Sequence, residues 1–118
     1  MALLTIAFVA VALLAPPEKS LGEAIRYVYV HVALTRAGIW GFYLAGLLGF
    51  TVVLFANRRL QHWTQVIAWV AFVLFLAGGV GSIFAQQASW GGLLLEEPRN
   101  RTSISVLAVA LIIMVINN

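Results

Sequence analysis

The side chains that could do chemistry in this 118-residue sequence are few, and several of them gather between residues 86 and 102. Two adjacent carboxylates, Glu96 and Glu97, are followed there by Arg99 and Arg101. Neighbouring residues on a regular helix point in different directions, so we do not expect these carboxylates to act as a paired general acid and base. We therefore predict no catalytic residue and no enzymatic activity.

Histidine is the other candidate, and the chain has two, His31 and His62, with no cysteine. Neither has a second metal-binding side chain at a ligand spacing, so the sequence predicts no metal site. Gly78, Gly79 and Gly81 are not followed by the pattern of a phosphate-binding loop. We expect these glycines to let a neighbouring helix approach closely.

The elements that position these residues must lie in lipid. The sequence is 63% hydrophobic and 9% charged, with a mean hydropathy of +1.01, more apolar surface than a soluble domain of this length could bury. The predicted fold class is all-α, an integral membrane bundle of about four transmembrane helices in a bilayer. The formal charge of +3 is spread along the loops, so no nucleic-acid partner is expected.

The charged and proline-containing segments divide the chain into spans. We expect spans at residues 1–15, 37–56, 63–85 and 103–117, an interfacial segment at 24–36 and an outer loop at 86–102. A signal-peptide core is the alternative for residues 1–15, although the basic start of a signal peptide is missing. The short first span is consistent with missing residues upstream, and the lack of a basic anchor at the end is consistent with a shortened C-terminus.

The basic residues also predict an orientation. Arg58 and Arg59 form the one loop with a basic excess and no acidic residue, which places loop 57–62 in the cytoplasm. His31, Trp90 and the segment around Glu97 then share one surface on the opposite side of the membrane.

Short motifs occur in a particular order along nearly the whole chain. They are Ala15-Pro16-Pro17, the segment Ile25–Val32 around His31, Gly81-Ser82, Trp90-Gly91, Pro98-Arg99 and Thr102-Ser103. Together they resemble the CcmC-type haem-handling proteins of cytochrome c maturation. The resemblance implies a location in the bacterial cytoplasmic membrane and an outward-facing, tryptophan-rich loop that supports haem. It also implies that His31 is the first haem ligand and that Trp90 belongs to the haem platform.

The sequence departs from that family in the same loop. Leu93, Leu94 and Glu96 stand where the family has three inner tryptophans, and Glu97 stands in place of an aspartate. The family's second haem-ligating histidine lies beyond the last residue of this chain. Porphyrin binding depends on aromatic faces and axial ligands, so we expect no bound cofactor. Haem held by His31 and Trp90 is the alternative.

Two functions follow from these expectations. The favoured one is a structural or assembly subunit, docked to other integral membrane subunits of a respiratory or photosynthetic electron-transfer complex. Its predicted partner-binding residues carry apolar side chains or charges of both signs: Leu93, Leu94, Leu95, Glu96, Glu97, Arg99 and Arg101. The alternative is haem binding or delivery to a cytochrome c or its apoprotein. The glycines of the second and third spans, among them Gly38 and Gly41, pack either within the bundle or against a partner.

Overall fold

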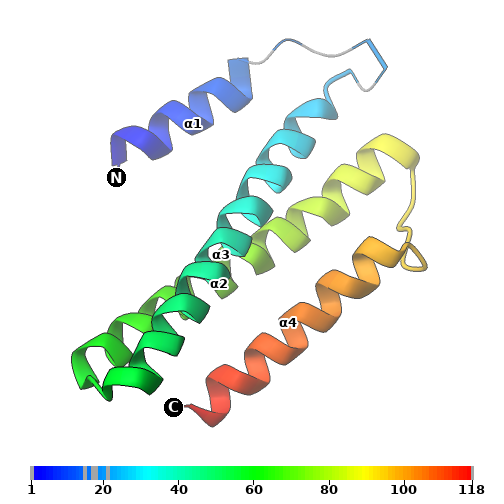
Figure 1. The fold of residues 1–118 in the computed structure, drawn as a ribbon. Coiled ribbons are helices and arrows are strands. Elements are labelled where there is room, and N and C mark those ends of the chain that lie inside the picture. Colours follow the sequence, from blue (N-terminus) through cyan, green and yellow to red (C-terminus); the bar gives the residue numbers. More distant parts are fainter. Residues whose placement is uncertain (1, 15, 17–18, 21, 118) are drawn as a thin grey trace.

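The computed structural model describes residues 2–14, 16, 19–20 and 22–117, and it places them in four helices (Figure 1). In chain order these are α1 (Ala2–Leu14), α2 (Ile25–Phe55), α3 (Arg58–Trp90) and α4 (Pro98–Ile116). Met1 of the expected first span, and Ala15 and Pro17 of the first motif, lie outside the described residues. The prediction of an all-α bundle of about four helices is confirmed.

Three of the helices, α2, α3 and α4, are long and apolar enough to cross a membrane. At a rise of 1.5 Å per residue, their 31, 33 and 19 residues extend about 46, 50 and 28 Å, against a hydrocarbon thickness of about 30 Å. The 13 residues of α1 extend about 20 Å, which is less than that thickness. The chain is therefore a multi-pass membrane protein.

Helices α2, α3 and α4 are longer than the spans expected from the sequence. The expected interfacial segment 24–36 is not separate, because from Ile25 onward it continues into α2 without a break. The expected outer loop 86–102 contracts to residues 91–97, which we call the linking segment, because α3 continues to Trp90 and α4 begins at Pro98. Proline suits the first position of a helix, since the amide hydrogen it lacks has no partner there.

A backbone hydrogen bond caps the end of α2, and a side chain caps the start of α3. Ala56 has the left-handed conformation (φ 49°), and its N–H donates to the Val52 carbonyl at 2.8 Å. The Asn57 side-chain oxygen then accepts from the N–H groups of Arg59 and Leu60, at 3.0 and 3.3 Å, as a helix N-cap does. A turn of two residues is thus enough to reverse the chain.

The close contact between α2 and α3, which we call the seam, is the tightest packing in the molecule. It pairs glycines of each helix with side chains of the other: Gly38 with Phe75, Gly41 with Ala71, Gly78 with Thr35 and Gly81 with His31. A Cβ atom added to Gly38 would lie 2.7 Å from the Cβ of Phe75, and one added to Gly41 would lie 2.7 Å from the Cβ of Ala71. The glycines thus permit an antiparallel pair in which the two backbones nearly touch.

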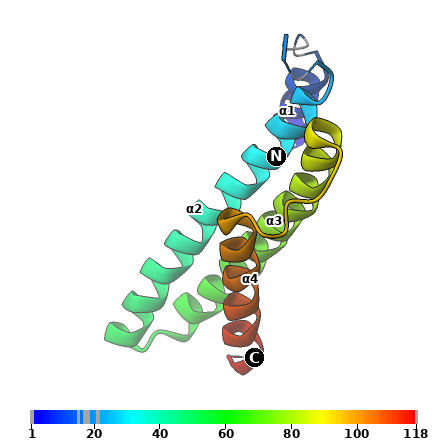
Figure 2. The ribbon, with the colours of Figure 1, turned by 90° about the vertical axis from the view of Figure 1, so that its right-hand side faces the viewer.

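The other helices are attached to this pair from the side. Among the described residues, α4 packs on α3, α1 contacts only α2, and no Cα atom of α4 lies within 8 Å of a Cα atom of α2. Figure 2 shows α2 and α4 diverging from each other in the half that contains the turn. The molecule measures 53 × 37 × 17 Å, so it is a thin slab whose large apolar side chains mostly lie on its surface.

Candidate functional site

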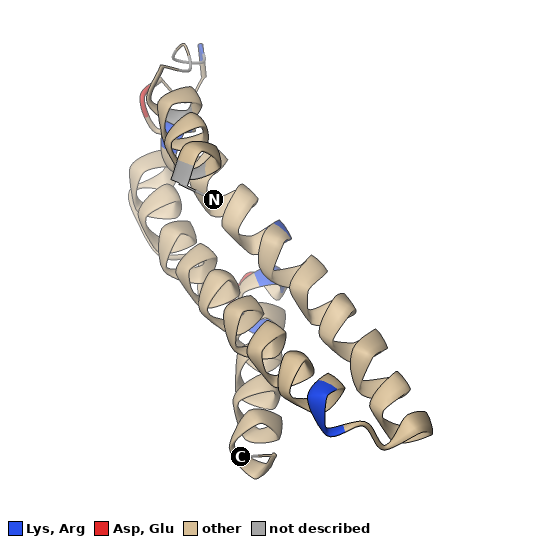
Figure 3. Ribbon diagram, turned by 90° about the vertical axis from the view of Figure 1, so that its left-hand side faces the viewer, with Lys and Arg blue, Asp and Glu red and all other residues tan. Residues whose placement is uncertain are grey.

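Charged side chains mark the ends of the long helices. Figure 3 shows basic residues where α3 begins, beside the turn, and these are Arg58 and Arg59. Glu23, Glu96 and Arg101 belong to the other end, before α2 or beside the start of α4. Arg36 is exposed part-way along α2, 19 residues before its end, or about 28 Å by helix rise. That distance is close to the hydrocarbon thickness of a bilayer, about 30 Å.

A groove of about 960 Å³ lies beside the linking segment, between α2, α3 and α4. We call it the loop-end groove. His31, Trp90, Glu97 and Arg99 all line it, so residues far apart in the sequence meet at one site, as the predicted shared surface requires. The other predicted site residues do not line this groove and instead lie exposed on the linking segment or in the first turn of α4: Leu93, Leu94, Leu95, Glu96 and Arg101.

His31 is positioned by the seam. Its ring Nδ1 lies 3.3 Å from the carbonyl oxygen of Gly78, so the tautomer protonated at Nδ1 donates across the two helices. The Thr35 hydroxyl donates to the His31 carbonyl at 2.8 Å. Nε2 then has no hydrogen bond within the described chain. A ring held in this way through one nitrogen can offer the other to a metal or to a polar ligand.

Trp90 lines the groove but is mostly exposed. It is the last residue of α3, and 64% of its surface is exposed. Gly91 follows it in the left-handed conformation (φ 69°) and donates its N–H to the Gln87 carbonyl at 3.0 Å, which ends the helix. The indole is therefore free on most of its surface, as a residue at a membrane interface can be.

The polar centre of this end of the molecule is Gln86, which sequence reasoning missed. Its side chain is buried, and its Oε1 accepts from the Leu94 N–H at 3.0 Å and from the Asn100 amide at 3.2 Å. Its Nε2 donates to the Asn100 Oδ1 at 3.1 Å, while Asn100 also donates to the Leu94 carbonyl at 2.6 Å. These bonds, which we call the amide clamp, fix the linking segment and the start of α4 to α3.

The charged side chains on and beside the linking segment do not pair with one another in the described part of the chain. Glu96, Glu97, Arg99 and Arg101 make no ion pair within the described part of the chain. The ion pair that the described residues do contain joins Arg26 to Glu23 at 2.9 Å, before and at the start of α2. Both charge signs are therefore available to a partner on a segment that the amide clamp holds in place.

No group of three or more histidine, cysteine, aspartate or glutamate side chains that could hold a metal occurs among the described residues. No protein-family model, curated protein or solved structure matches the chain. The family resemblance and the cofactor expectation drawn from the sequence therefore stay predictions.

Proposed function

We propose that this protein is a non-enzymatic structural subunit that docks to other membrane subunits through its linking segment and the first turn of α4. The observation that carries the proposal is the combination of exposed Leu93–Leu95, unpaired charges of both signs and a braced backbone. The amide clamp has already ordered this segment, so docking would lose little conformational freedom.

The chemistry of the segment favours a protein partner. The leucines supply apolar area that a monomer would otherwise leave exposed, and the neighbouring charges can set the register of a partner of complementary charge. The nature of the host, a respiratory or photosynthetic electron-transfer complex, is supported by the resemblance to haem-handling proteins of cytochrome c maturation.

A charge-neutralising double variant tests the docking proposal. Glu97→Gln with Arg99→Gln should release the protein from its complex in mild detergent while leaving it inserted in the membrane. Glu23→Gln with Arg26→Gln is the matched control, because it removes the same two charges from a pair that already satisfies itself. Copurification of the partner subunits is measured by mass spectrometry. A wild-type chain that runs as a free monomer from native membranes would refute the proposal.

The proposal includes an orientation with the turn between α2 and α3 in the cytoplasm, supported by Arg58 and Arg59. A single cysteine at Lys19, which lies outside the proposed docking segment, should react with an impermeant thiol reagent added outside intact cells. A cysteine at Gln61 should react only after the cells are opened. The reverse labelling pattern would overturn the orientation.

Haem handling is the second candidate function, and the orientation of the His31 ring favours it. Nδ1 is held by the Gly78 carbonyl, which leaves Nε2 for an axial bond in a groove large enough to receive a porphyrin. Arg99, which lines the same groove, could hold a propionate. One axial nitrogen and a mostly exposed Trp90 make a modest haem site, which is why the subunit role is preferred.

Haem titration separates the two candidates. The purified protein in detergent is mixed with haemin, and the Soret absorbance of wild type and His31→Ala is compared. The subunit role predicts no stoichiometric Soret band and the same spectrum for both proteins. Tight haem binding that is lost on this substitution would establish the second candidate in its place.

A further inference from the structure

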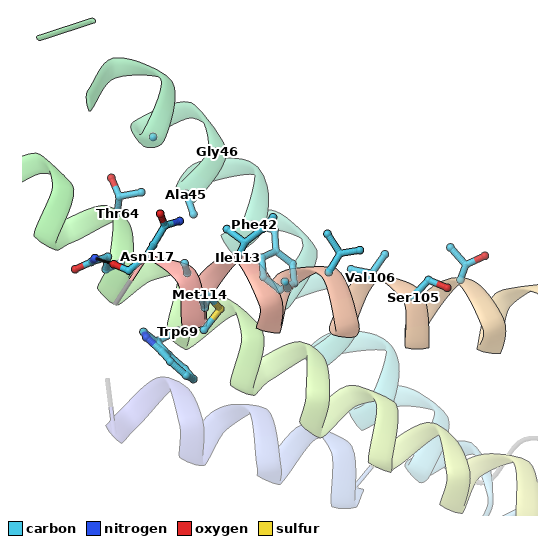
Figure 4. Close-up of a pocket in the computed structure, with 16 residues that line it drawn as sticks. Phe42, Ala45, Gly46, Thr64, Trp69, Ser105, Val106, Ile113, Met114 and Asn117 are labelled. Atoms are coloured by element: carbon cyan, nitrogen blue, oxygen red, sulfur yellow. Dashed lines mark hydrogen bonds between the residues drawn. The ribbon is translucent and has the colours of Figure 1, made fainter. Parts of the chain in front are cut away.

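A second groove, of about 610 Å³, lies nearer the turn, and we call it the turn-end groove. Figure 4 shows its lining: Ala45 and the backbone of Gly46 belong to α2, Thr64 and Trp69 to α3, and a row of side chains that includes Ile113 to α4. Phe42, Thr102 and Val106 line both grooves, so the two join into one cleft. Its floor is α3, and its walls are α2 and α4.

Hydrogen bonds attach α4 to α3 at both ends of this cleft. At one end is the amide clamp, in which Gln86 holds Asn100. At the other end the Gln65 side chain donates to the backbone carbonyl of Asn117 at 2.8 Å. Between these ends, the face of α4 that carries Val106, Val109 and Ile113 borders open space and does not reach α2.

Two glycines that line the cleft have no close neighbour on the Cβ side in the described part of the chain. At Gly46 of α2 and Gly79 of α3, an added Cβ would meet nothing within 4 Å. Elsewhere in these helices the protein places glycine where the other helix comes close, as at Gly38 and Gly78. Glycine inside a helix costs about 1 kcal/mol relative to alanine. A glycine that lines the cleft without a close neighbour is therefore consistent with a partner helix that approaches it as closely as α2 and α3 approach each other.

The hydroxyls that line the turn-end groove are already hydrogen-bonded within the chain. The hydroxyls of Thr64, Thr102 and Ser105 donate to carbonyls of their own helices, at 2.9, 2.8 and 2.9 Å. Ser82 likewise donates to the Gly79 carbonyl at 2.6 Å. An occupant with an uncharged, apolar surface therefore fits the turn-end groove. The loop-end groove is more polar, because the Ser89 hydroxyl is buried there without a partner among the described residues and Glu97 and Arg99 line it.

We infer that this cleft receives one uncharged transmembrane helix of a partner subunit, lying between α2 and α4 and passing close to Gly46 and Gly79. The cleft follows α4 for its whole length, about 28 Å, which is the thickness of both leaflets together. A helix crosses that distance with every backbone group bonded internally, whereas the acyl chains of one lipid reach only half of it. This inference rests on the proposed function and adds a second surface to the linking segment.

Photo-crosslinking from α4 tests it. Benzoylphenylalanine is placed at Val109, which lines the cleft, or at Ile112, which does not, and the two are equally exposed at 56% and 58%. In native membranes, Val109 should crosslink to an uncharged transmembrane segment of another subunit, mapped by peptide sequencing, and Ile112 should not. Products containing only lipid, only a second copy of this chain, or the same partner from both positions would overturn the inference.

A variant that fills the cleft provides a second test of the inference. Gly46→Phe places a ring in the cleft and should abolish the Val109 crosslink and reduce recovery of that partner about tenfold or more. Ala37→Phe, an equally large change at an exposed position of α2 outside the cleft, should leave both unchanged. An unaffected crosslink in Gly46→Phe would refute the inference. If partners copurify but Val109 yields no protein crosslink, only the cleft inference fails; if nothing copurifies, the proposed function fails.

Discussion

Helix α2 meets two of its neighbours differently. It packs closely on α3 along the seam, and the cleft separates it from α4. Across the seam, Gly38 and Gly78 bring two backbones together, and His31 adds a hydrogen bond to the Gly78 carbonyl. Across the cleft, α2 and α4 stay apart, and α4 is held to α3 by Gln86 at one end and Gln65 at the other. Helix α2 is therefore closely packed on the side that faces α3 and unpacked on the side that faces α4.

This difference shows which part of the molecule is self-sufficient. Helices in lipid gain little from hydrophobicity and must associate through close packing or polar contacts. The α2–α3 pair has close packing along its seam. The attachment of α4 depends on a few amides, so small changes at those amides should move it.

The largest expected effect is a difference in folding stability between the same substitution made at two glycines of α2. Gly38→Ala puts a methyl group 2.7 Å from the Phe75 backbone nitrogen and should destabilise the fold by about 3 kcal/mol. Gly46→Ala meets open space and should be neutral or stabilise by up to about 1 kcal/mol, because alanine favours helix. Denaturation in detergent by titrated sodium dodecyl sulfate measures both. Equal destabilisation by the two variants would contradict the contrast between seam and cleft.

A middle-sized effect is expected at the amide clamp. Gln86→Leu leaves the Leu94 N–H and part of the Asn100 amide without partners, at a cost of about 1–3 kcal/mol. Hydrogen exchange should then accelerate in residues 91–97, while the seam keeps its protection. Gln87→Leu is the control, since that neighbouring side chain is exposed and makes no hydrogen bond in the described chain. Unchanged exchange in Gln86→Leu would show that the clamp does not hold the segment.

The smallest effect is expected at the other attachment of α4. Gln65→Leu removes one exposed hydrogen bond to the Asn117 carbonyl and should cost about 0.5–1 kcal/mol. Spin labels at Val66 and Val115 should report a wider spread of distances between α3 and α4 in this variant. Gln61→Leu, one turn earlier on α3, should leave that spread as it is, and a change of the same size in both variants would count against the Gln65 bond.

The sequence predicts the helices and the seam well because their signals are local. Long apolar runs require helices in lipid, and Gly38, Gly41, Gly78 and Gly81 recur at helical spacing on two neighbouring spans. Packing within the bundle, one of the two uses expected for these glycines, is the one that the structure shows for all four. At Gly79, expected to act with them, an added Cβ would meet nothing within 4 Å among the described residues.

The helix ends and the cleft are where sequence reasoning fell short. Gln86 and Gln87 interrupt an apolar run and resemble the start of a loop, but a partner 14 residues away in sequence, Asn100, satisfies Gln86 inside a helix. The gap between α2 and α4 has no local signal, since it depends on how two amides position α4. The meeting of His31 and Trp90 at one groove could be anticipated, whereas the hydrogen bond between His31 and Gly78 could not.

The two-residue turn at Ala56 and Asn57 leaves α2 and α3 almost no freedom to enter the membrane one at a time. Contacts next to the turn form with very little loop to close, and each further contact along the seam can follow the previous one as a zipper does. During synthesis this hairpin can therefore be complete before α4 leaves the ribosome. The last helix would then arrive at a membrane in which the surface that receives it already exists.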